Sequence, residues 1–362
     1  METSGLDGFS GRRVLVTGAS GFIGRRVVPA LRAAGAKVTV LSRSRSGSAL
    51  ADAVDSVAGD LGRRGDVDRA LAGQDVLVHL AYDVRATAAQ NLADFETLLA
   101  AAGAAHLARV VHASSIVVYD GWPGADLDES CPMIRPGGSP YRRAKIAMEQ
   151  RLIASGLPVT ILQPTLVYGP GSTLWTDTFA EWLAAGAVVL PEPEGRCNAV
   201  YVDDVAQALV RAAAQDGSGQ ARFIISGVSP VSWSDLLTGY AGILGRGSIR
   251  HEAMAALAAR VGPAPDPETA IPDAPSKAAR LSALARGVLG RERVEGLVHA
   301  VKRRMAPQGD HYPDRFLLDL FAARGVCRID RAREMLGYAP AFGLAEGLAA
   351  TAPYLAQRYG AA

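Results

Sequence analysis

Two side chains one helical turn apart, Tyr141 and Lys145, are the residues of this sequence best suited to acid–base chemistry. Pro140 stands directly before them, as is common in the first turn of a helix, so we expect both side chains on one helix face. A lysine ammonium close to a phenol favours the phenolate and lowers the pKa of the phenol toward neutral pH. Tyr141 is therefore a candidate general acid or base for a hydroxyl or carbonyl group. Ser115, which follows a predicted strand, could hold the same oxygen by a hydrogen bond.

A glycine-rich turn near the start of the chain could bind a phosphate-containing cofactor. Gly18, Gly21 and Gly24 follow a short apolar run and precede a helical pattern over Arg25–Ala34. A dinucleotide-binding loop requires this order of strand, glycine turn and helix. The glycines leave room for a pyrophosphate, and the helix directs unpaired N–H groups and its positive dipole end at that anion. A structural turn without a ligand is the alternative interpretation.

The end of the second predicted strand, Lys37–Leu41, indicates which dinucleotide is bound. In NAD-binding folds an acidic residue closes this strand and hydrogen-bonds the ribose 2′-hydroxyl. Here Ser42 occupies that place and Arg43 follows it. A carboxylate would repel a 2′-phosphate, whereas a guanidinium binds one through two hydrogen bonds. The sequence therefore favours NADP(H) over NAD(H), with a loop charge that binds no ligand as the simpler interpretation of Arg43.

Short apolar runs alternate with helical patterns, which is typical of right-handed βαβ units and a parallel, doubly wound sheet. The expected strands are a run that begins at Val14, then 37–41, one that ends within 57–61, 75–81, 109–113, 158–163 and 222–226. Ligands of such sheets bind at the carboxyl ends of the strands. The glycine turn, Arg43, Ala81 and Ser115 all fall at such ends.

A series of short motifs runs through nearly the whole chain. They are Thr17-Gly18-x-x-Gly21-x-x-Gly24, Gly59-Asp60, His79-Leu80-Ala81, Ser114-Ser115, Tyr141-x-x-x-Lys145, Gln163-Pro164, Tyr201-Val202-Asp203-Asp204 and Leu336-Gly337-Tyr338. With these motifs the chain resembles the extended short-chain dehydrogenases/reductases, the NAD(P)-dependent epimerase/dehydratase group. The resemblance implies that Ser115, Tyr141 and Lys145 form a catalytic triad, and that Lys145 also holds the nicotinamide ribose.

The glycine turn and the resemblance together define the expected cofactor contacts. These are Gly18, Ser20, Gly21, Phe22, Ile23, Gly24, Arg43, Asp60, Leu61, Leu80, Ala81, Tyr141, Lys145 and Pro164. Asp60 could accept a hydrogen bond from an adenine amino group or cap the next helix. Asn91 falls where the family often has an asparagine in the helix before the fifth strand.

Three departures from the family's pattern favour a reductase or dehydrogenase. Dehydratases of nucleotide sugars carry an acidic pair after the catalytic serine or threonine, but here Ile116 and Val117 follow. Sugar-nucleotide epimerases usually have an asparagine where Leu166 stands and an arginine where Cys197 stands, and those residues hold the sugar and the diphosphate. These epimerases also generally keep an acidic residue where Ser42 stands, because they hold NAD.

Composition narrows the class of protein. The chain has 362 residues, 49% of them hydrophobic, and a net charge of +2, which is an ordinary soluble α/β composition without a nucleic-acid surface. The three cysteines lie far apart without metal-ligand spacing, so we expect reduced thiols and no metal site. No apolar run is long enough to span a bilayer, and the N-terminus lacks a signal-peptide pattern. A cytoplasmic location without a membrane partner is the expectation.

We expect a Rossmann-type dinucleotide-binding domain over residues 1–170, to which segments near 196–226 return. Residues 171–362 are expected to form a smaller, mostly helical substrate-binding or lid region. Within it, the alanine-rich stretch 250–324 is broken by prolines, with helical patterns over 277–286 and 292–305. It is expected to form a helical lid or a dimerisation element. The predicted helices 89–105 and 141–154 could pair two copies into a homodimer.

The sequence thus predicts an NADP(H)-dependent oxidoreductase of a small-molecule substrate. Hydride would pass between the nicotinamide and a carbonyl or secondary alcohol, with Tyr141 exchanging the proton. The alternative is a nucleotide-sugar epimerase that keeps NAD bound and unconsumed. A cofactor-binding protein without catalytic activity is a third hypothesis.

Overall fold

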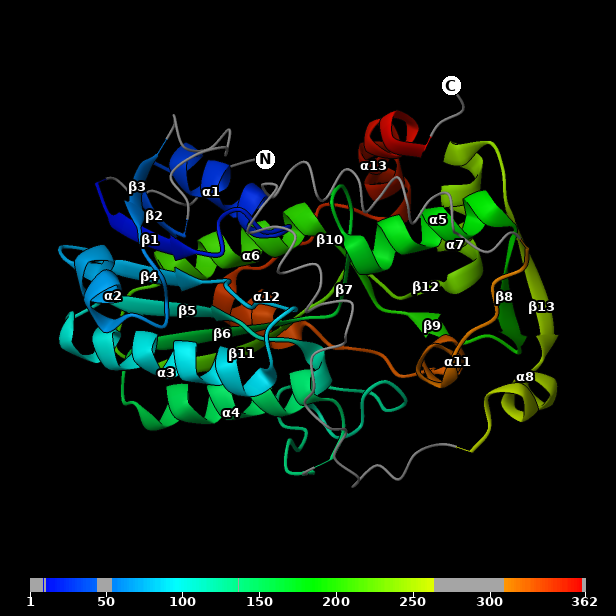
Figure 1. Ribbon diagram of the computed structural model, residues 1–362, viewed down its shortest axis with the longest axis horizontal. Helices are drawn as coiled ribbons and strands as arrows, with labels where there is room; N and C mark the ends of the chain where they lie inside the picture. Colours follow the sequence, from blue (N-terminus) through cyan, green and yellow to red (C-terminus); the bar gives the residue numbers. More distant parts are fainter. Residues whose placement is uncertain (1–8, 10, 44–53, 136, 264–308, 360–362) are drawn as a thin grey trace, which may run out of the picture.

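A seven-stranded parallel sheet forms the core of the lobe on the left of Figure 1. The computed structural model describes residues 9, 11–43, 54–135, 137–263 and 309–359. The strands of the sheet lie in the order β11-β6-β5-β4-β1-β2-β3, and each pairs in parallel with its neighbour. Their bounds are β1 Arg13–Thr17, β2 Lys37–Ser42, β3 Asp55–Ala58, β4 Val76–His79, β5 Arg109–Ala113, β6 Val159–Pro164 and β11 Gln220–Ile225. The expected doubly wound Rossmann fold is confirmed.

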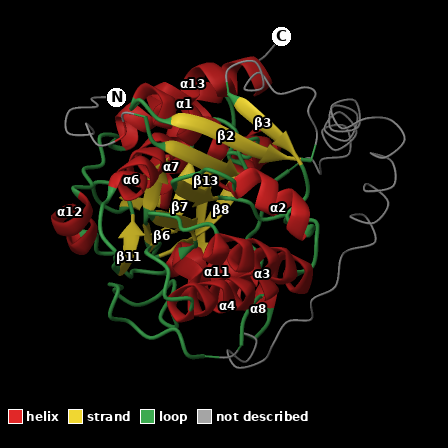
Figure 2. Cartoon of the chain, turned by 90° about the vertical axis from the view of Figure 1, so that its left-hand side faces the viewer, coloured by secondary structure: helices red, strands yellow, loops and turns green. Residues whose placement is uncertain are grey.

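Helices cover both faces of this sheet (Figure 2). One face carries α1 (Gly24–Ala33) and α6 (Val202–Ala214), and the other carries α2 (Arg64–Leu71), α3 (Ala88–Ala104) and α4 (Pro140–Ala154). The side chains of β1 alternate between two apolar clusters: Val14 and Val16 belong to one, and Leu15 belongs to the other. Every residue of β5 is buried, as expected of an inner parallel strand.

The second lobe, on the right of Figure 1, combines helices with short two-stranded pairs. The pairs are β7 (Leu166–Tyr168) with β10 (Ala199–Tyr201), β9 (Arg196–Cys197) with β12 (Val231–Ser232), and β8 (Ala187–Glu192) with β13 (Ser248–Ala253). The helices are α5 (Thr178–Ala185), α7 (Trp233–Leu244), α8 (Met254–Val261), α11 (Arg315–Ala322) and α13 (Leu344–Tyr359), with α12 (Asp330–Leu336) beside β11. The helical patterns at 277–286 and 292–305 lie outside the described residues.

An aromatic cluster fills the core of this lobe. Phe179 is buried and packs edge-on against Trp182 and Trp233, with ring centroids 5.3 Å and 6.0 Å away. A π-helix, Thr173–Asp177, directly precedes α5. The side chain of Ser172 accepts a hydrogen bond from the Trp175 N–H and so caps the N-terminus of the π-helix.

The chain leaves the sheet after β6, passes through the second lobe and returns as β11. Further along the chain, residues 325–327 are held by the side chain of the buried Asn198. Its Nδ2 donates to the Gly325 carbonyl at 2.8 Å. The Cys327 N–H donates to Asn198 Oδ1 at 3.1 Å. One side chain therefore fastens residues 325–327 against the body of the protein.

The described part of the chain contains neither a membrane-spanning helix nor a cluster of metal ligands. No helix there has both the length and the apolar character that crossing a membrane requires. No group of three histidine, cysteine or acidic side chains is gathered there in a way that could hold a metal ion.

Candidate active site

The glycine turn packs so closely that two of its positions admit no side chain. Gly18 has a φ of +75°, and a Cβ on it would lie 2.7 Å from the Ala81 backbone nitrogen. A Cβ on Gly24 would collide with the Gly18 carbonyl oxygen. The turn therefore lies directly on the end of β4, and α1 starts at Gly24 with its N-terminus at this edge of the sheet.

A cleft of about 400 Å³ opens above this turn. The expected cofactor residues that line it are Gly18, Ser20, Gly21, Arg43, Asp60, Leu61, Leu80 and Ala81. The expected residues outside this lining are Phe22, Ile23, Gly24, Tyr141, Lys145 and Pro164. Tyr82 and Asp83 also line the cleft, as does Asn91 from α3. Sequence reasoning missed Tyr82 and Asp83, although both directly follow the His79-Leu80-Ala81 motif.

Two charged residues mark the rim of the cleft at the end of β2 and β3. Arg43 follows β2, has a largely exposed side chain and forms an ion pair with Asp83. Asp60 accepts a hydrogen bond from the Gly62 N–H at 2.9 Å. Asp60 does not cap α2, which begins at Arg64 without a side-chain cap, so its carboxylate stays in the cleft.

The start of α4 is fixed by local interactions on both sides of Tyr141. Ser139 caps the helix by accepting a hydrogen bond from the Arg142 N–H at 3.2 Å, and Pro140 is its first residue. The buried Arg142 guanidinium donates to Asp120 Oδ1 at 2.5 Å. These contacts fix the direction in which Tyr141 and Lys145 leave the helix.

The structure brings the three expected triad residues together. The Ser115 hydroxyl lies close enough to the Tyr141 phenol to lower the pKa of that phenol. Lys145 is buried, and its Nζ donates to the Ala113 carbonyl at the end of β5 over 2.7 Å. The same Nζ lies 5.8 Å from the centroid of the Tyr141 ring. A phenol, a hydroxyl and an ammonium therefore meet at the carboxyl end of β5.

The electrostatics of the triad differ from the expectation in one respect. Burial raises the pKa of the Tyr141 phenol, and the nearby Ser115 hydroxyl opposes that shift. We expected Lys145 to lower this pKa, but its Nζ is directed at the Ala113 carbonyl, so desolvation of the phenol dominates. Burial also lowers the pKa of Lys145 to about 8, against the attraction of Glu149.

Tyr82 links the triad to the cleft. Its ring meets the Tyr141 ring edge-on with centroids 5.0 Å apart, and Lys145 Nζ lies 5.2 Å from its centroid. Because Tyr82 also lines the cleft, the triad adjoins the cleft through this ring. His79, expected to be a core histidine, is buried, with Nδ1 2.7 Å from Thr17 Oγ1.

Comparison with known proteins identifies the family. The sequence model of the NAD dependent epimerase/dehydratase family matches residues 14–225, which is more than half of the chain. The chain belongs to this family. Its members include oxidoreductases and epimerases, so the family supports an enzyme.

Relatives within this family have different activities. A 4-hydroxy-2-methyl-3-oxo-4-farnesyl-3,4-dihydroquinoline-1-oxide ketoreductase of Stigmatella aurantiaca is 30% identical over 246 residues, covering 62% of this chain and 71% of that protein. A UDP-glucose 4-epimerase of Mycolicibacterium smegmatis is 30% identical over 262 residues, covering 64% and 83%. The solved structure of MoeE5 in complex with UDP-glucose and NAD aligns with a TM-score of 0.65 at 22% identity, over 96% and 99% of the two chains. That similarity supports the fold of the family.

Two positions associated with sugar-nucleotide recognition are buried. Cys197 lies in β9 with no exposed surface, and burial raises the pKa of its thiol far above the ordinary range. Leu166 begins β7 and is buried as well. Arg196, the neighbouring cation, is exposed and belongs to the strand pair with β12. Neither Cys197 nor Leu166 offers a charged or hydrogen-bonding side chain to a diphosphate.

Proposed function

We propose that this protein is an NADP(H)-dependent oxidoreductase that reduces, or forms, the carbonyl group of an apolar substrate. The observation that carries the proposal is the Tyr141 phenol beside the Ser115 hydroxyl, with the Lys145 Nζ 5.8 Å from the centroid of the Tyr141 ring. An acid, a hydrogen-bonding hydroxyl and a buried cation around one point are the groups that carbonyl reduction requires.

The residues present fit a dinucleotide. Gly18 leaves its backbone open where a Cβ would fill the space, and the cleft above it measures about 400 Å³. Gly18, Ser20 and Gly21 would hold the pyrophosphate, and Arg43 a 2′-phosphate. When bound, the nicotinamide would supply or accept the hydride.

Each triad residue has a separate role in this mechanism. Ser115 holds the substrate oxygen by a hydrogen bond. Tyr141 gives its hydroxyl proton to that oxygen during reduction and takes it back during oxidation. Lys145 places a buried positive charge 5.8 Å from the centroid of the Tyr141 ring and would hold the ribose hydroxyls of the cofactor.

The proposed apolar substrate rests on three exposed apolar side chains. Val84, Ile134 and Leu174 are 83%, 85% and 66% exposed, and they follow β4, β5 and β7 respectively. Val84 and Ile134 lie in segments that follow strands of the central sheet, at whose carboxyl ends ligands bind, and Val84 lines the nucleotide cleft. The buried Cys197 and Leu166 make a nucleotide diphosphate a poor fit. The farnesyl-carrying substrate named for the Stigmatella relative supports the same class.

The proposed mechanism is tested with Tyr141→Phe. Oxidation of NADPH is followed with a panel of alkyl and prenyl ketones of increasing chain length. We expect kcat to fall by about 10²–10⁴-fold, because general acid catalysis contributes on that order. Cofactor affinity should stay within about threefold, since the phenol contributes one of many cofactor contacts. Turnover within a few-fold of the parent would contradict the assigned role.

The cofactor is tested by calorimetric titration of cofactor-stripped protein with NADPH and NADH. We expect tighter binding of NADPH by about tenfold or more, lost in Arg43→Ala, because a charge-assisted contact to phosphate contributes roughly 1.5–3 kcal/mol. Arg64→Ala is the matched control, because Arg64 is exposed and pairs with Asp68 on α2. Equal affinity for both dinucleotides would contradict the role of Arg43.

The similarity to a UDP-glucose 4-epimerase supports a second candidate function. An epimerase would oxidise a sugar hydroxyl with the same triad and return the hydride to the other face. Protein that retains tight NAD and isomerises a sugar nucleotide without added cofactor would select this candidate over the reductase.

A further inference from the structure

A buried carboxylate lies directly behind the triad. Glu149 follows Lys145 by one turn of α4, and none of its surface is exposed. Ser114 Oγ donates to Glu149 Oε1 at 2.5 Å. Gln163 Nε2 donates to both carboxylate oxygens at 3.0 Å, and Arg222 Nε forms an ion pair with Oε2 at 3.2 Å.

The partners of Glu149 are arranged to receive a negative charge. The Tyr119 hydroxyl donates to Gln163 Oε1 at 2.7 Å, so the amide nitrogen of Gln163 is the atom that faces Glu149. Ser114 also donates, and Arg222 carries a positive charge. A buried ionised carboxylate is costly unless it is paired and hydrogen-bonded. Burial raises the pKa of the Glu149 carboxyl, and the hydrogen bonds from Ser114 and Gln163 and the charges of Arg222 and Lys145 oppose that shift.

Two of these donors stand next to residues of the candidate site. Ser114, at the end of β5, directly precedes Ser115. Gln163 in β6 directly precedes Pro164, an expected cofactor contact. Arg222 comes from β11, the edge strand of the sheet. The Glu149 carboxylate is therefore the point at which β5, β6, β11 and the catalytic helix meet.

We propose that Glu149 is a positioning residue of the catalytic site, whose ionised carboxylate fixes the end of β5 beside Ser115 and keeps the Lys145 ammonium charged. The catalytic part of this inference rests on the proposed function. The electrostatic part concerns the folded protein alone.

Glu149 is the negatively charged group that raises the pKa of Lys145. His79 of β4 and His112 of β5 face Lys145, and burial holds the pKa of both imidazoles far below the ordinary value, so they are neutral. The Tyr82 and Tyr141 rings lie on its other side. Burial lowers the pKa of Lys145 to about 8, and the charge on Glu149 raises it. Loss of that charge therefore lowers the pKa of Lys145 further.

The test is a pH titration of the lysine ε-carbons by NMR in the full chain, with the Lys145 signal assigned from Lys145→Arg. In Glu149→Gln we expect Lys145 to titrate about one pH unit or more below the parent, as for loss of a nearby opposite charge. The pH above which kcat falls should move down by the same amount. An unchanged Lys145 titration in this variant overturns the proposal.

Three variants separate the effect of the Glu149 charge from the effect of its position. Glu149→Asp keeps the charge, so the pH profile should return to that of the parent while kcat stays reduced. Ser114→Ala removes one hydrogen bond to Glu149 and should lower kcat without moving the pH profile. Glu96→Gln is the matched control, because Glu96 pairs with Arg151 of α4 at an exposed position, and it should change neither.

A measurement on the parent covers the case in which Glu149→Gln does not fold. The side-chain carboxyl signal of Glu149 is followed between pH 6 and 9, and we expect the ionised form throughout. A protonated Glu149 at neutral pH would overturn the proposal. The titrations need no turnover, so failure of the reductase assignment would leave their outcome intact.

Discussion

The Arg43 guanidinium lies 3.4 Å from a carboxylate oxygen of Asp83 at the rim of the nucleotide cleft. Asn91 holds Asp83 in place, because its Oδ1 accepts from the Asp83 N–H at 2.7 Å and its Nδ2 donates to the Asp83 carbonyl at 2.9 Å. The cation proposed for the 2′-phosphate thus already has an anion beside it. A phosphate that binds Arg43 must compete with that carboxylate and lie close to it.

Asp83→Asn is therefore expected to tighten NADPH binding. Removing the negative charge frees Arg43 and relieves repulsion of the phosphate, which should lower the dissociation constant by about three- to tenfold, as for a partly exposed ion pair. NADH, without the phosphate, should change by less than twofold. Calorimetric titration of both cofactors measures the difference. Asp68→Asn on α2 is the control, and weaker NADPH binding in Asp83→Asn would show that Asp83 orients Arg43 instead.

Tyr82 is expected to position the Tyr141 ring. An edge-on aromatic pair contributes about 0.5–1.5 kcal/mol beyond the area that it buries, so Tyr82→Ala should lower kcat by about two- to tenfold. Tyr82→Phe keeps the ring that meets Tyr141 at 5.0 Å and should stay close to the parent. Steady-state kinetics of the two variants checks this. Equal losses in both would assign the effect to the Tyr82 hydroxyl.

His112 is expected to destabilise the protein at acid pH. It is buried, its ring stacks on His79, and neither ring nitrogen has a hydrogen-bond partner among the described residues. Burial lowers its pKa in the folded state, so the unfolded chain takes up the proton first as the pH falls below about 6.5. Stability should then decrease by about 1.4 kcal/mol per pH unit from this residue.

His112→Leu removes that proton uptake, so its advantage over the parent should grow as the pH falls from 6.5 to 5. At neutral pH the variant should be as stable as the parent or more stable, because two unpaired polar atoms leave the core. Urea unfolding at several pH values measures the difference. The exposed His106→Asn, which keeps a residue type that tolerates the φ of 51° there, controls for loss of a histidine. A difference that does not vary with pH would contradict this prediction.

Asn198→Ala is expected to lower the stability of the protein, because Asn198 holds residues 325–327 in place. It removes both buried hydrogen bonds to residues 325–327, which should cost about 2–4 kcal/mol of unfolding free energy. Gln207→Ala is a matched control, because Gln207 holds Ala339 of the same C-terminal part by one longer bond of 3.4 Å at the surface. Denaturant unfolding measures both. A loss below about 0.5 kcal/mol in Asn198→Ala, typical of a surface change, would be inconsistent with this role.

Local patterns in the sequence were enough to predict the sheet and to place Tyr141 and Lys145 in one helix. The strand Arg109–Ala113 and the helix Trp233–Leu244 have the predicted bounds, because apolar runs and helical periodicity are set by neighbouring residues. Tyr141 and Lys145 were found by their spacing within one helix. Strand β4 ends at His79 and is therefore shorter than expected. The backbone of the next two residues, Leu80 and Ala81, packs directly against Gly18.

What the sequence left out depends on contacts between distant residues. Arg222 lies far along the chain from Glu149, and the pairing of β11 with β6 brings them together. The pKa of the Tyr141 phenol depends on how deeply the folded chain buries it, which spacing does not reveal. Tyr82 carries no motif of its own, so its place beside Tyr141 required the structure.

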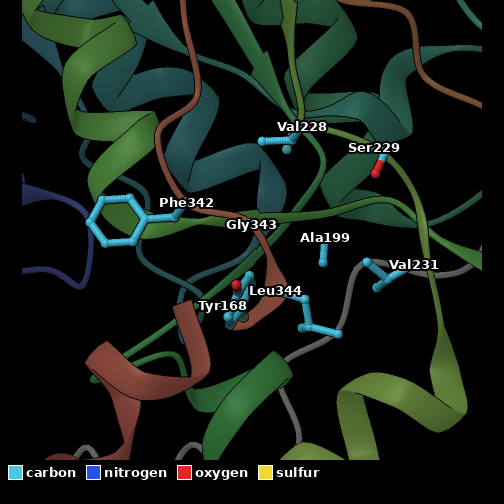
Figure 3. A pocket seen from close by; sticks show the side chains of 9 residues that line it. Tyr168, Ala199, Val228, Ser229, Val231, Phe342, Gly343 and Leu344 are labelled. Atoms are coloured by element: carbon cyan, nitrogen blue, oxygen red, sulfur yellow. The ribbon is translucent and has the colours of Figure 1, made fainter. Parts of the chain in front are cut away.

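Tight packing at the glycine turn also bears on redesign of the protein. Gly18 and the backbone at Ala81 leave no room for a side chain between them. No larger residue can therefore replace Gly18 at the floor of the cleft. A separate small pocket, bordered by Tyr168 and Phe342 (Figure 3), shares no lining residue with the cleft. Cofactor preference can therefore be re-engineered only at the rim, where Arg43 and Asp83 are exposed enough to be exchanged without rebuilding the fold.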